Sequence, residues 1–348
     1  MRVPEAMKVG MYYNNRDVRV EYMPVPRIDK RDLLIKVKAC AICGTDIMEW
    51  YRIKKAPMVQ GHELTGDIVE IGKDVKGYNI GDRVFATHHV PCDECYDCKR
   101  GNGTLCEEFQ KGNNFDPGGF SEYVRVTGRS VETGILKLPD NVAYEEGTFV
   151  EPLASVVEGV TFQKGDTVLV LGSGIAGLLN IKFARERGVG KIIATDLSDS
   201  RLEAARRFGA DYITRAKDCS PEFIRELNDG RLADVVIISA ASTSATEQAL
   251  QSFDKGGRVI HFATPREGEK TGRDDYANWR TGLIETRTYG ATPESCREAL
   301  ELVASGTITV DDMITHRLSL EEIGEGFRVA SSGEGLKVII EPNRENAN

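Results

Sequence analysis

Four of the chain's eight cysteines stand in one short window, Cys92-x2-Cys95-x2-Cys98-x7-Cys106. Four thiolates at this spacing can surround one tetrahedral zinc ion and leave no coordination position open. Such a closed site stabilises a loop and carries out no reaction, so we predict a structural zinc here. The alternatives are a thiol–disulfide centre, disfavoured because no thioredoxin-like βαβ pattern surrounds the C-x-x-C pairs, and a nucleic-acid zinc ribbon, disfavoured by the acidic charge balance.

A second set of possible metal ligands is spread along the chain. The stretches "CGTD" at 43–46, "GHE" at 61–63 and "EPL" at 151–153 contain Cys43, His62, and Glu63 or Glu151. Three protein ligands and one open position form the pattern of a catalytic zinc. A His-Glu pair alone is more often part of a surface or a core than a metal site, so spacing does not decide between these interpretations.

A glycine-rich loop stands between a predicted strand and a predicted helix in "TVLVLGSGIAGLLNIKFA". In Gly172-x-Gly174-x-x-Gly177 the first glycine permits a tight turn, the second lets the backbone approach a pyrophosphate, and the third lets helix and strand pack closely. The helix N-terminus then faces the phosphates. The predicted cofactor-binding residues of this loop are Gly172, Gly174, Ile175, Ala176 and Gly177.

Two further residues extend the nucleotide-binding pattern. Asp196 ends the next predicted strand, "KIIATD", 19 residues after Gly177. A carboxylate there is placed to bond both adenosine ribose hydroxyls, which favours NAD over NADP. Arg201 stands a turn later and could contact the adenine side. The alternative is a glycine-rich turn that binds no nucleotide.

Composition limits the classes of partner. The chain has 348 residues, enough for two domains, and a formal net charge of -9, which disfavours nucleic acid and anionic lipid as main partners. Its first 20 residues contain no apolar segment typical of a signal peptide, and no apolar run reaches the roughly 18 residues of a membrane span. We therefore expect a cytoplasmic protein, whose clustered thiols stay reduced and bind metal.

The order of predicted elements indicates an α/β protein with two kinds of domain. Residues 1 to about 155 contain many short strand patterns punctuated by glycine and aspartate. From Thr167 apolar runs alternate with helical patterns, which predicts a parallel sheet with helices on both faces. After about Thr292 a helix, "PESCREALELVASG", precedes a final strand, "LKVIIEP".

These motifs together resemble one known family. The stretches "CGTD", "GHELTGDIVEIG", "GDRV", the four-cysteine lobe, "GGFSEY", "KLPDNV", "VEPLA", "GDTVLVLGSGIAG", "ATDLSDSRLEAARRFGAD" and "THRLSLEEIGEGF" cover nearly the whole chain. They resemble the zinc-dependent medium-chain dehydrogenase/reductase family, in the branch of sorbitol (L-iditol) and threonine dehydrogenases. The resemblance implies a GroES-like β-rich catalytic domain over 1–155 and 292–348 and a Rossmann doubly wound parallel-sheet domain over 156–291.

The resemblance also implies cofactors and an active site. NAD would bind the Rossmann domain, two Zn²⁺ ions per subunit would be catalytic and structural, and the active site would lie in the cleft between the domains. Cys43 and His62, with Glu63 or Glu151, resemble the catalytic zinc ligands, and both glutamates would lie near the metal. Thr45 resembles the hydroxyl that receives the substrate's proton. Such enzymes usually form homodimers or homotetramers.

Two carried-over residues have structural alternatives. Asp46 resembles the family's acid that orients the ligating imidazole, although it could also cap a helix that begins near Ile47. Lys337 resembles a basic residue that helps bind the pyrophosphate, although it could also be an exposed lysine in a last strand.

The chain departs from its relatives along the proton path. Many relatives have a histidine two residues after the aspartate of the CG(S/T)D motif, and that position here is Met48. One hypothesis is that Glu49, His88 or His89 takes over part of its role. The alternative is that Met48 packs and the proton passes to water, while His88 and His89 pack beside the cysteine lobe.

The substrate-binding region also departs. Sorbitol dehydrogenases have an Arg-Tyr pair in the region of "ETRTYGATP", but here Arg287 and Tyr289 are separated by Thr288. Because side chains alternate between the two faces of a strand, we do not assign sorbitol as the substrate. Trp50 and Tyr51 could line a pocket or could be ordinary aromatic packing.

The implied activity is hydride transfer between NAD and a secondary alcohol or its ketone, with a polyol or sugar-derived alcohol favoured. Zinc would acidify the alcohol as a Lewis acid, and the cofactor would accept the hydride. The alternatives are a threonine-like hydroxy-amino-acid dehydrogenase and a zinc- and nucleotide-binding protein without catalytic activity.

Overall fold

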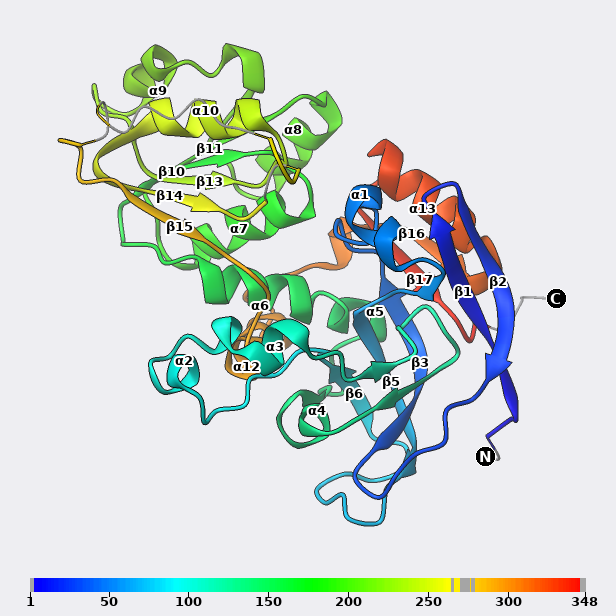
Figure 1. Ribbon diagram of the computed structural model, residues 1–348. Coiled ribbons are helices and arrows are strands. Elements are labelled where there is room, and N and C mark those ends of the chain that lie inside the picture. Colours follow the sequence, from blue (N-terminus) through cyan, green and yellow to red (C-terminus); the bar gives the residue numbers. More distant parts are fainter. Residues whose placement is uncertain (1–2, 264–265, 270–275, 277–278, 345–348) are drawn as a thin grey trace. The chain divides into compact units, whose positions relative to one another are not determined.

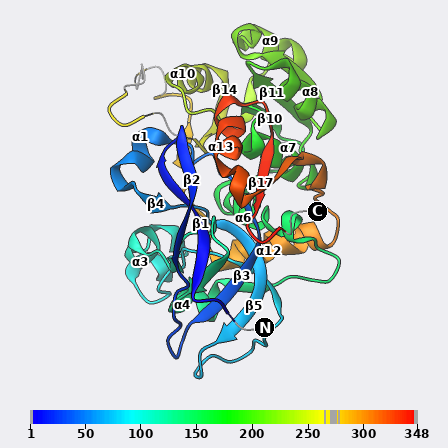
Figure 2. The same cartoon turned by 90° about the vertical axis from the view of Figure 1, so that its right-hand side faces the viewer.

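The computed structural model describes residues 3–263, 266–269, 276 and 279–344. The chain divides into two compact units (Figures 1 and 2). Unit 1 contains Met1–Ala154 and Gly290–Asn348, and unit 2 contains Ser155–Tyr289. One helix, α6 (Val150–Gly159), continues across the division. Within the described part of the chain, no helix is long and apolar enough to cross a membrane.

Unit 1 is rich in short strands, as the punctuated strand patterns of the sequence predict, and these strands form two sheets. The three-stranded sheet has the order β2-β1-β4. The larger sheet has the order β16-β17-β3-β5-β6-β9, and β8 pairs with both β3 and β7 beside this path. The strands are β1 (Ala6–Asn14), β2 (Asp17–Pro24), β3 (Leu33–Ala41), β4 (Met58–Val59), β5 (Glu63–Ile71), β6 (Arg83–Ala86), β7 (Phe115–Asp116), β8 (Tyr123–Val126), β9 (Ile135–Lys137), β16 (Ile314–Ser319) and β17 (Lys337–Glu341).

Most helices of unit 1 are short and lie in the connections between strands. Helix α12 has a well-formed start: Thr292 accepts a hydrogen bond from the main-chain N–H of Ser295, and Pro293 takes the first helical position. The helices of unit 1 are α1 (Glu49–Arg52), α2 (Tyr96–Lys99), α3 (Glu107–Lys111), α4 (Arg129–Thr133), α5 (Tyr144–Gly147), α12 (Pro293–Ala304) and α13 (Ile323–Ser332).

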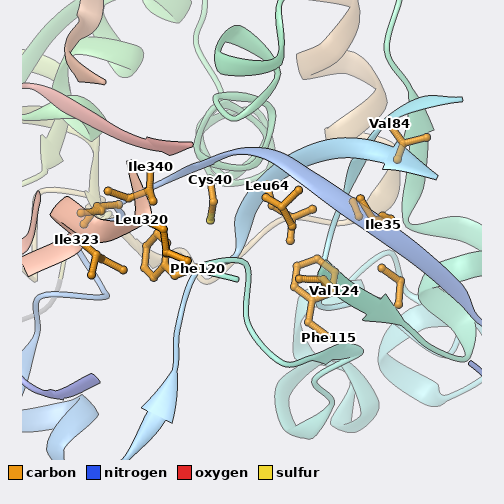
Figure 3. Close-up of a cluster of buried hydrophobic side chains, with 14 of the residues drawn as sticks. Ile35, Cys40, Leu64, Val84, Phe115, Phe120, Val124, Leu320, Ile323 and Ile340 are labelled. Atoms are coloured by element: carbon orange, nitrogen blue, oxygen red, sulfur yellow. The ribbon is translucent and has the colours of Figure 1, made fainter. Parts of the chain in front are cut away.

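A buried apolar cluster fixes the strands from which the candidate metal ligands extend (Figure 3). Cys40 of β3, Leu64 of β5 and Ile340 of β17 belong to it, together with Phe120 and Ile323. Each of these side chains is fully buried, with 0% exposed. Full burial of a side chain of the Leu or Phe type stabilises the fold by about 1.5–3 kcal/mol. The packing therefore holds the ends of β3 and β5 close to one another.

Unit 2 contains a six-stranded parallel sheet with the order β12-β11-β10-β13-β14-β15. Every residue of the central strand β10 is buried, which is typical of a sheet covered on both faces. The doubly wound parallel sheet predicted from the sequence is confirmed. Its elements are β10 (Thr167–Leu171), α7 (Ile175–Glu186), β11 (Lys191–Asp196), α8 (Asp199–Arg207), β12 (Tyr212–Arg215), α9 (Pro221–Leu227), β13 (Ala233–Ile238), α10 (Thr243–Ser252), β14 (Phe253–His261) and β15 (Ile284–Arg287).

Candidate active site and metal centres

Strand order in unit 1 brings three candidate ligands together. Strand β3 lies between β17 and β5, and its last residue, Ala41, pairs with Glu63. Cys43 follows β3 by two residues, while His62 immediately precedes β5. One ligand atom from each of Cys43, His62 and Glu63 lies within 4.8 Å of the others. A thiolate, an imidazole and a carboxylate form a donor set that fits zinc.

A glycine permits the close approach of the "GHE" segment. Gly61 has a φ of +99°, which L side chains rarely adopt. A Cβ there would stand 2.7 Å from the main-chain nitrogen of Phe120 and 2.8 Å from Cys40 Sγ. Only a residue without a side chain therefore lets His62 enter the site from this direction.

Asp46 joins two of the candidate ligands. Its side chain is 1% exposed; Oδ2 accepts a hydrogen bond from the Cys43 main-chain N–H at 3.0 Å, and Oδ1 lies 3.5 Å from His62 Nδ1. Helix α1 begins at Glu49, and its N-cap is Met48. The interpretation of Asp46 as a helix cap is therefore wrong, because its carboxylate closes a turn back to Cys43 instead.

The charges of this pair support one another. Burial by itself raises the pKa of Asp46, but the imidazole of His62 outweighs it and holds that pKa below its usual value. Burial likewise lowers the pKa of His62, but Asp46 and Cys43 outweigh it and hold that pKa well above its usual value. With Nδ1 directed at Asp46, Nε2 is the nitrogen left to ligate, and a metal would have to displace the second proton.

Glu151 lies near this group but not within it. Burial, followed by the charge of Glu63, raises the pKa of Glu151 to about 7, while His62 and Lys337 act in the opposite direction. In the described residues the compact ligand cluster contains Glu63 and not Glu151. The choice between the two glutamates as ligand therefore favours Glu63 in this geometry, with Glu151 close enough to feel its charge.

Lys337 is the cation that offsets Glu63. Its Nζ pairs with Glu63 Oε2, and the two side chains are 2% and 1% exposed. Burial lowers the pKa of Lys337, but Glu63 and Cys43 outweigh it and the net shift is upward. The alternative of an exposed lysine is wrong. The predicted contact of Lys337 with a pyrophosphate stays a prediction.

We expect Lys337→Met to lower the free energy of unfolding of metal-free protein by about 3–5 kcal/mol, because it leaves the Glu63 carboxylate buried without its partner. Urea denaturation monitored by circular dichroism measures the change. The matched control is the double variant Lys337→Met/Glu63→Gln, which removes both charges and should regain most of the loss. Equal stability of the single variant and the wild type would contradict the pairing.

The three residues proposed to replace the missing relay histidine lie in different surroundings. Glu49 accepts a hydrogen bond from the main-chain N–H of Asn15 at 2.9 Å. The His88 ring lies 5.1 Å from that of His62 and 3.8 Å from that of His89. Burial lowers the pKa of His89 to about 4 and that of His88 well below its usual value, so both imidazoles are neutral at pH 7. Their relay role stays a prediction.

The four-cysteine lobe forms a second compact ligand group. The sulfurs of Cys92, Cys95, Cys98 and Cys106 lie within 4.8 Å of one another. The Cys95–Cys98 and Cys92–Cys98 sulfur distances are 3.4 and 3.9 Å, far beyond the roughly 2.05 Å of a disulfide. Burial raises the pKa of Cys106, but main-chain N–H groups outweigh it and lower that pKa to about 7, which favours a thiolate ligand. The arrangement fits a closed metal site.

The glycine loop of unit 2 has the geometry of a phosphate site. Gly172 follows β10 with a φ of +99°, and helix α7 begins at Ile175 with Gly174 as its N-cap and no side-chain cap. Its first N–H groups can therefore bind a phosphate. A Cβ on Gly177 would stand 2.0 Å from the carbonyl oxygen of Gly172, so a larger residue would displace the loop.

Asp196, the last residue of β11, fixes this loop. Its Oδ2 accepts a hydrogen bond from the Ser173 N–H at 2.8 Å, and Oδ1 accepts from the N–H groups of Leu197 and Ser198 at 2.8 and 2.9 Å. Arg201 in α8 has a buried Nε without a hydrogen-bond partner among the described residues. The structure therefore places Asp196 beside the loop and Arg201 in α8, the helix that follows β11.

The residues considered for substrate binding lie in separate elements, α1 of unit 1 and β15 of unit 2. Trp50 and Tyr51 lie in α1, with ring centroids 6.1 Å apart. Arg287 in β15 donates to Glu285 Oε1 at 3.1 Å, and its side chain is 65% exposed. Sequence reasoning missed Arg52 of α1, whose guanidinium contacts Thr45 and Asp46. The CGTD motif does not mark it, because Arg52 lies seven residues after Thr45 and six after Asp46.

This chain is similar to known dehydrogenases in both sequence and fold. Residues 29–140 match the model of the alcohol dehydrogenase GroES-like domain, and residues 176–305 match that of the zinc-binding dehydrogenases. The sorbitol dehydrogenase of Bacillus subtilis (strain 168) is 30% identical over 98% of this chain and 99% of its own length. The L-threonine 3-dehydrogenase of Bacillus licheniformis is 31% identical over 92% and 94%. A putative zinc-binding dehydrogenase of Sinorhizobium meliloti 1021, solved bound to NADP, superposes with a TM-score of 0.85 at 28% identity, over 97% of this chain and 100% of that one.

Proposed function

Because this chain belongs to the zinc-dependent medium-chain dehydrogenase/reductase family, in its sorbitol and threonine dehydrogenase-like branch, it is a zinc- and NAD(P)-dependent alcohol oxidoreductase, and we propose that it oxidises a polyol or sugar-derived secondary alcohol with NAD. The observation that carries the proposal is the compact group of Cys43, His62 and Glu63 beside Asp46. A sorbitol dehydrogenase 30% identical over 98% of this chain supports a polyol.

We propose that Cys43, His62 and Glu63, with Glu151 nearby, hold the catalytic zinc, which when bound supplies Lewis acidity to the substrate hydroxyl. Asp46 keeps the imidazole of His62 oriented. Thr45 is exposed, and its Oγ1 lies 3.3 Å from Cys43 Sγ, so its hydroxyl can accept the alcohol's proton beside the ligands. The proton then leaves through the hydroxyl of Thr45 toward solvent.

The remaining parts of the proposal concern binding and stability. The loop Gly172–Gly177 and the start of α7 bind the cofactor pyrophosphate through main-chain N–H groups. Cys92, Cys95, Cys98 and Cys106 hold the structural zinc. We also retain a homodimer or homotetramer and a cytoplasmic location as proposals.

The preference for NAD is tested at Asp196. Its carboxylate should accept hydrogen bonds from the ribose hydroxyls and repel a 2′-phosphate. We therefore expect Asp196→Asn to lower kcat/KM for NAD by about 10–100-fold, because a charged hydrogen bond is lost. The ratio of kcat/KM with NAD to kcat/KM with NADP should also become smaller. Asparagine keeps an acceptor for the Ser173 N–H, which limits disruption of the loop. Asp199→Asn, three residues later, is the matched control. A wild-type preference for NADP would contradict the assignment.

The substrate class is tested by NADH formation with zinc-replete protein on polyols, cyclitols, threonine and simple secondary alcohols. Turnover that is highest with a polyol supports the proposal. Highest turnover with threonine favours the second candidate, which rests on the L-threonine 3-dehydrogenase relative at 31% identity over 92% of the chain. Tight NAD binding without turnover of any of them would favour a non-catalytic binding protein.

A further inference from the structure

We infer that Arg52 is a positioning residue of this active site, and that its guanidinium fixes the Thr45 hydroxyl and the Asp46 carboxylate from one helical turn after Met48. This inference rests on the proposed function of an alcohol oxidoreductase. Arg52 lies outside the CGTD, GHE and EPL motifs that contain the candidate ligands.

Three contacts define the position of the guanidinium. Arg52 Nε donates to the main-chain oxygen of Thr45 at 2.9 Å. The same side chain donates through one terminal nitrogen to Thr45 Oγ1 at 3.2 Å and to Asp46 Oδ1 at 3.5 Å. The Arg52 side chain is 15% exposed. It is therefore held between the two residues that follow the Cys43 turn and is not a freely moving surface cation.

Local helix geometry explains how Arg52 reaches these atoms. Its main-chain N–H donates to the carbonyl oxygen of Met48 at 3.0 Å, so Arg52 stands one helical turn after Met48. Side chains in a helix lean toward its N-terminus, which directs the guanidinium back over residues 45 and 46. Asn15 Nδ2 donates to the Ile47 carbonyl oxygen at 2.8 Å and anchors the start of this turn to the β1–β2 connection.

The contact with Thr45 restricts its hydroxyl. A hydroxyl oxygen has two lone pairs and one hydrogen. Arg52 occupies one lone pair, which leaves a single lone pair for an incoming proton and a single O–H to pass a proton on. In this structure Thr45 Oγ1 lies within hydrogen-bonding distance of Cys43 Sγ, at 3.3 Å, so passing a proton to solvent requires the O–H to turn away from that sulfur. The guanidinium thus restricts the rotation of the hydroxyl and leaves it one position at which to accept a proton.

Arg52 cannot itself carry the proton, because a guanidinium stays protonated in proteins. Its charge has a second effect on the site. Glu63 and Asp46, both with side chains 1% exposed, each have a cationic partner, Lys337 and Arg52 respectively. The two buried carboxylates are thereby offset by cations, which removes the repulsion that they would otherwise exert on an ionised substrate hydroxyl.

The test is a double-mutant cycle between Arg52 and Thr45 in zinc-replete protein, measured with whichever alcohol the wild type oxidises. We expect Arg52→Gln to lower kcat by about 10–100-fold with KM for NAD within threefold and two zinc ions retained. In a Thr45→Val background the same change should lower kcat by a clearly smaller factor, because the contact with Thr45 Oγ1 is already lost and only the contact with Asp46 remains. Lys55→Gln, in the same segment, is the control and should stay within twofold of the wild type.

An equal loss of kcat in both backgrounds, or no loss in either, would overturn the inference. If Arg52→Gln binds fewer than two zinc ions, Arg52→Lys decides: it keeps the charge but cannot span Thr45 and Asp46 together, so kcat should fall about tenfold at full zinc content, and wild-type kcat would overturn the role.

A readout without substrate separates this inference from the proposed function. With cobalt in place of zinc, Arg52→Gln should shift the visible absorption of the Cys43–His62 centre, because Asp46 loses one of its partners. An unchanged spectrum would overturn the Asp46 contact, whether or not a substrate is found.

Discussion

Replacement of Cys43 by alanine is expected to lower kcat for alcohol oxidation by about 1,000-fold or more and to reduce bound zinc from two ions to one per subunit. The reason is that the thiolate stands with His62 and Glu63 in the compact ligand group, and a Lewis acid contributes several kcal/mol to stabilising the charge of the reacting oxygen, where each 1.36 kcal/mol is tenfold in rate. Steady-state kinetics and metal analysis of the same sample measure both quantities.

Cys219→Ala is the matched control for this substitution. Cys219 is 4% exposed and belongs to the apolar cluster of unit 2, and burial raises its pKa to about 11, so its thiol is neutral. The same chemical change there should leave zinc content and kcat within about threefold of the wild type. A Cys43→Ala protein that keeps two zinc ions and its activity would place the catalytic metal elsewhere.

Replacement of Cys106 by serine is expected to remove the other zinc ion and to unfold the lobe around it. Cys106 is 1% exposed, its sulfur accepts from the Cys92 N–H at 3.3 Å, and structural zinc contributes roughly 10–16 kcal/mol in small zinc domains. We expect rapid proteolysis between residues 92 and 106 and a lowered melting temperature. Limited digestion with mass analysis locates the cleavage.

Activity should fall together with the lobe. The His89 ring lies 5.3 Å from that of Phe109, which packs with the lobe cysteines, and the His88 ring lies 5.1 Å from that of His62. The two centres of unit 1 are thus joined by a row of rings. Activity that instead falls on mild oxidation and returns on reduction, with zinc content constant, would favour the thiol–disulfide alternative over the structural zinc.

Features that depend only on short stretches of the chain could be predicted from the sequence. The cysteine window and the G-x-G-x-x-G loop are local patterns whose chemistry follows from spacing, and the structure gathers the sulfurs and places the loop between β10 and α7 as expected. The parallel sheet of unit 2 followed from the alternation of apolar runs and helical patterns. None of these features depends on the order of the strands within a sheet.

Contacts that depend on strand order or on one helical turn were not predictable in the same way. The pairing of Lys337 with Glu63 requires β17 and β5 to lie on either side of β3, which the sequence of unit 1 does not specify. The sequence allowed two interpretations of Asp46, a helix cap and an acid that orients the imidazole of His62, because the start of α1 was uncertain by two residues. Arg52 was not predicted because it lies outside the motif, and only the helical turn after Met48 brings its guanidinium back to Thr45.

The neighbours of β3 have a consequence for synthesis of the chain on the ribosome. Strands β3 and β5 are translated early, but β17, which carries Lys337, is made only after the whole of unit 2. Until then Glu63 lacks its ion pair with Lys337, and burying the carboxylate without a cationic partner is costly. We therefore expect the arrangement of Cys43, His62 and Glu63 in metal-free protein to become stable only after β17 has been synthesised.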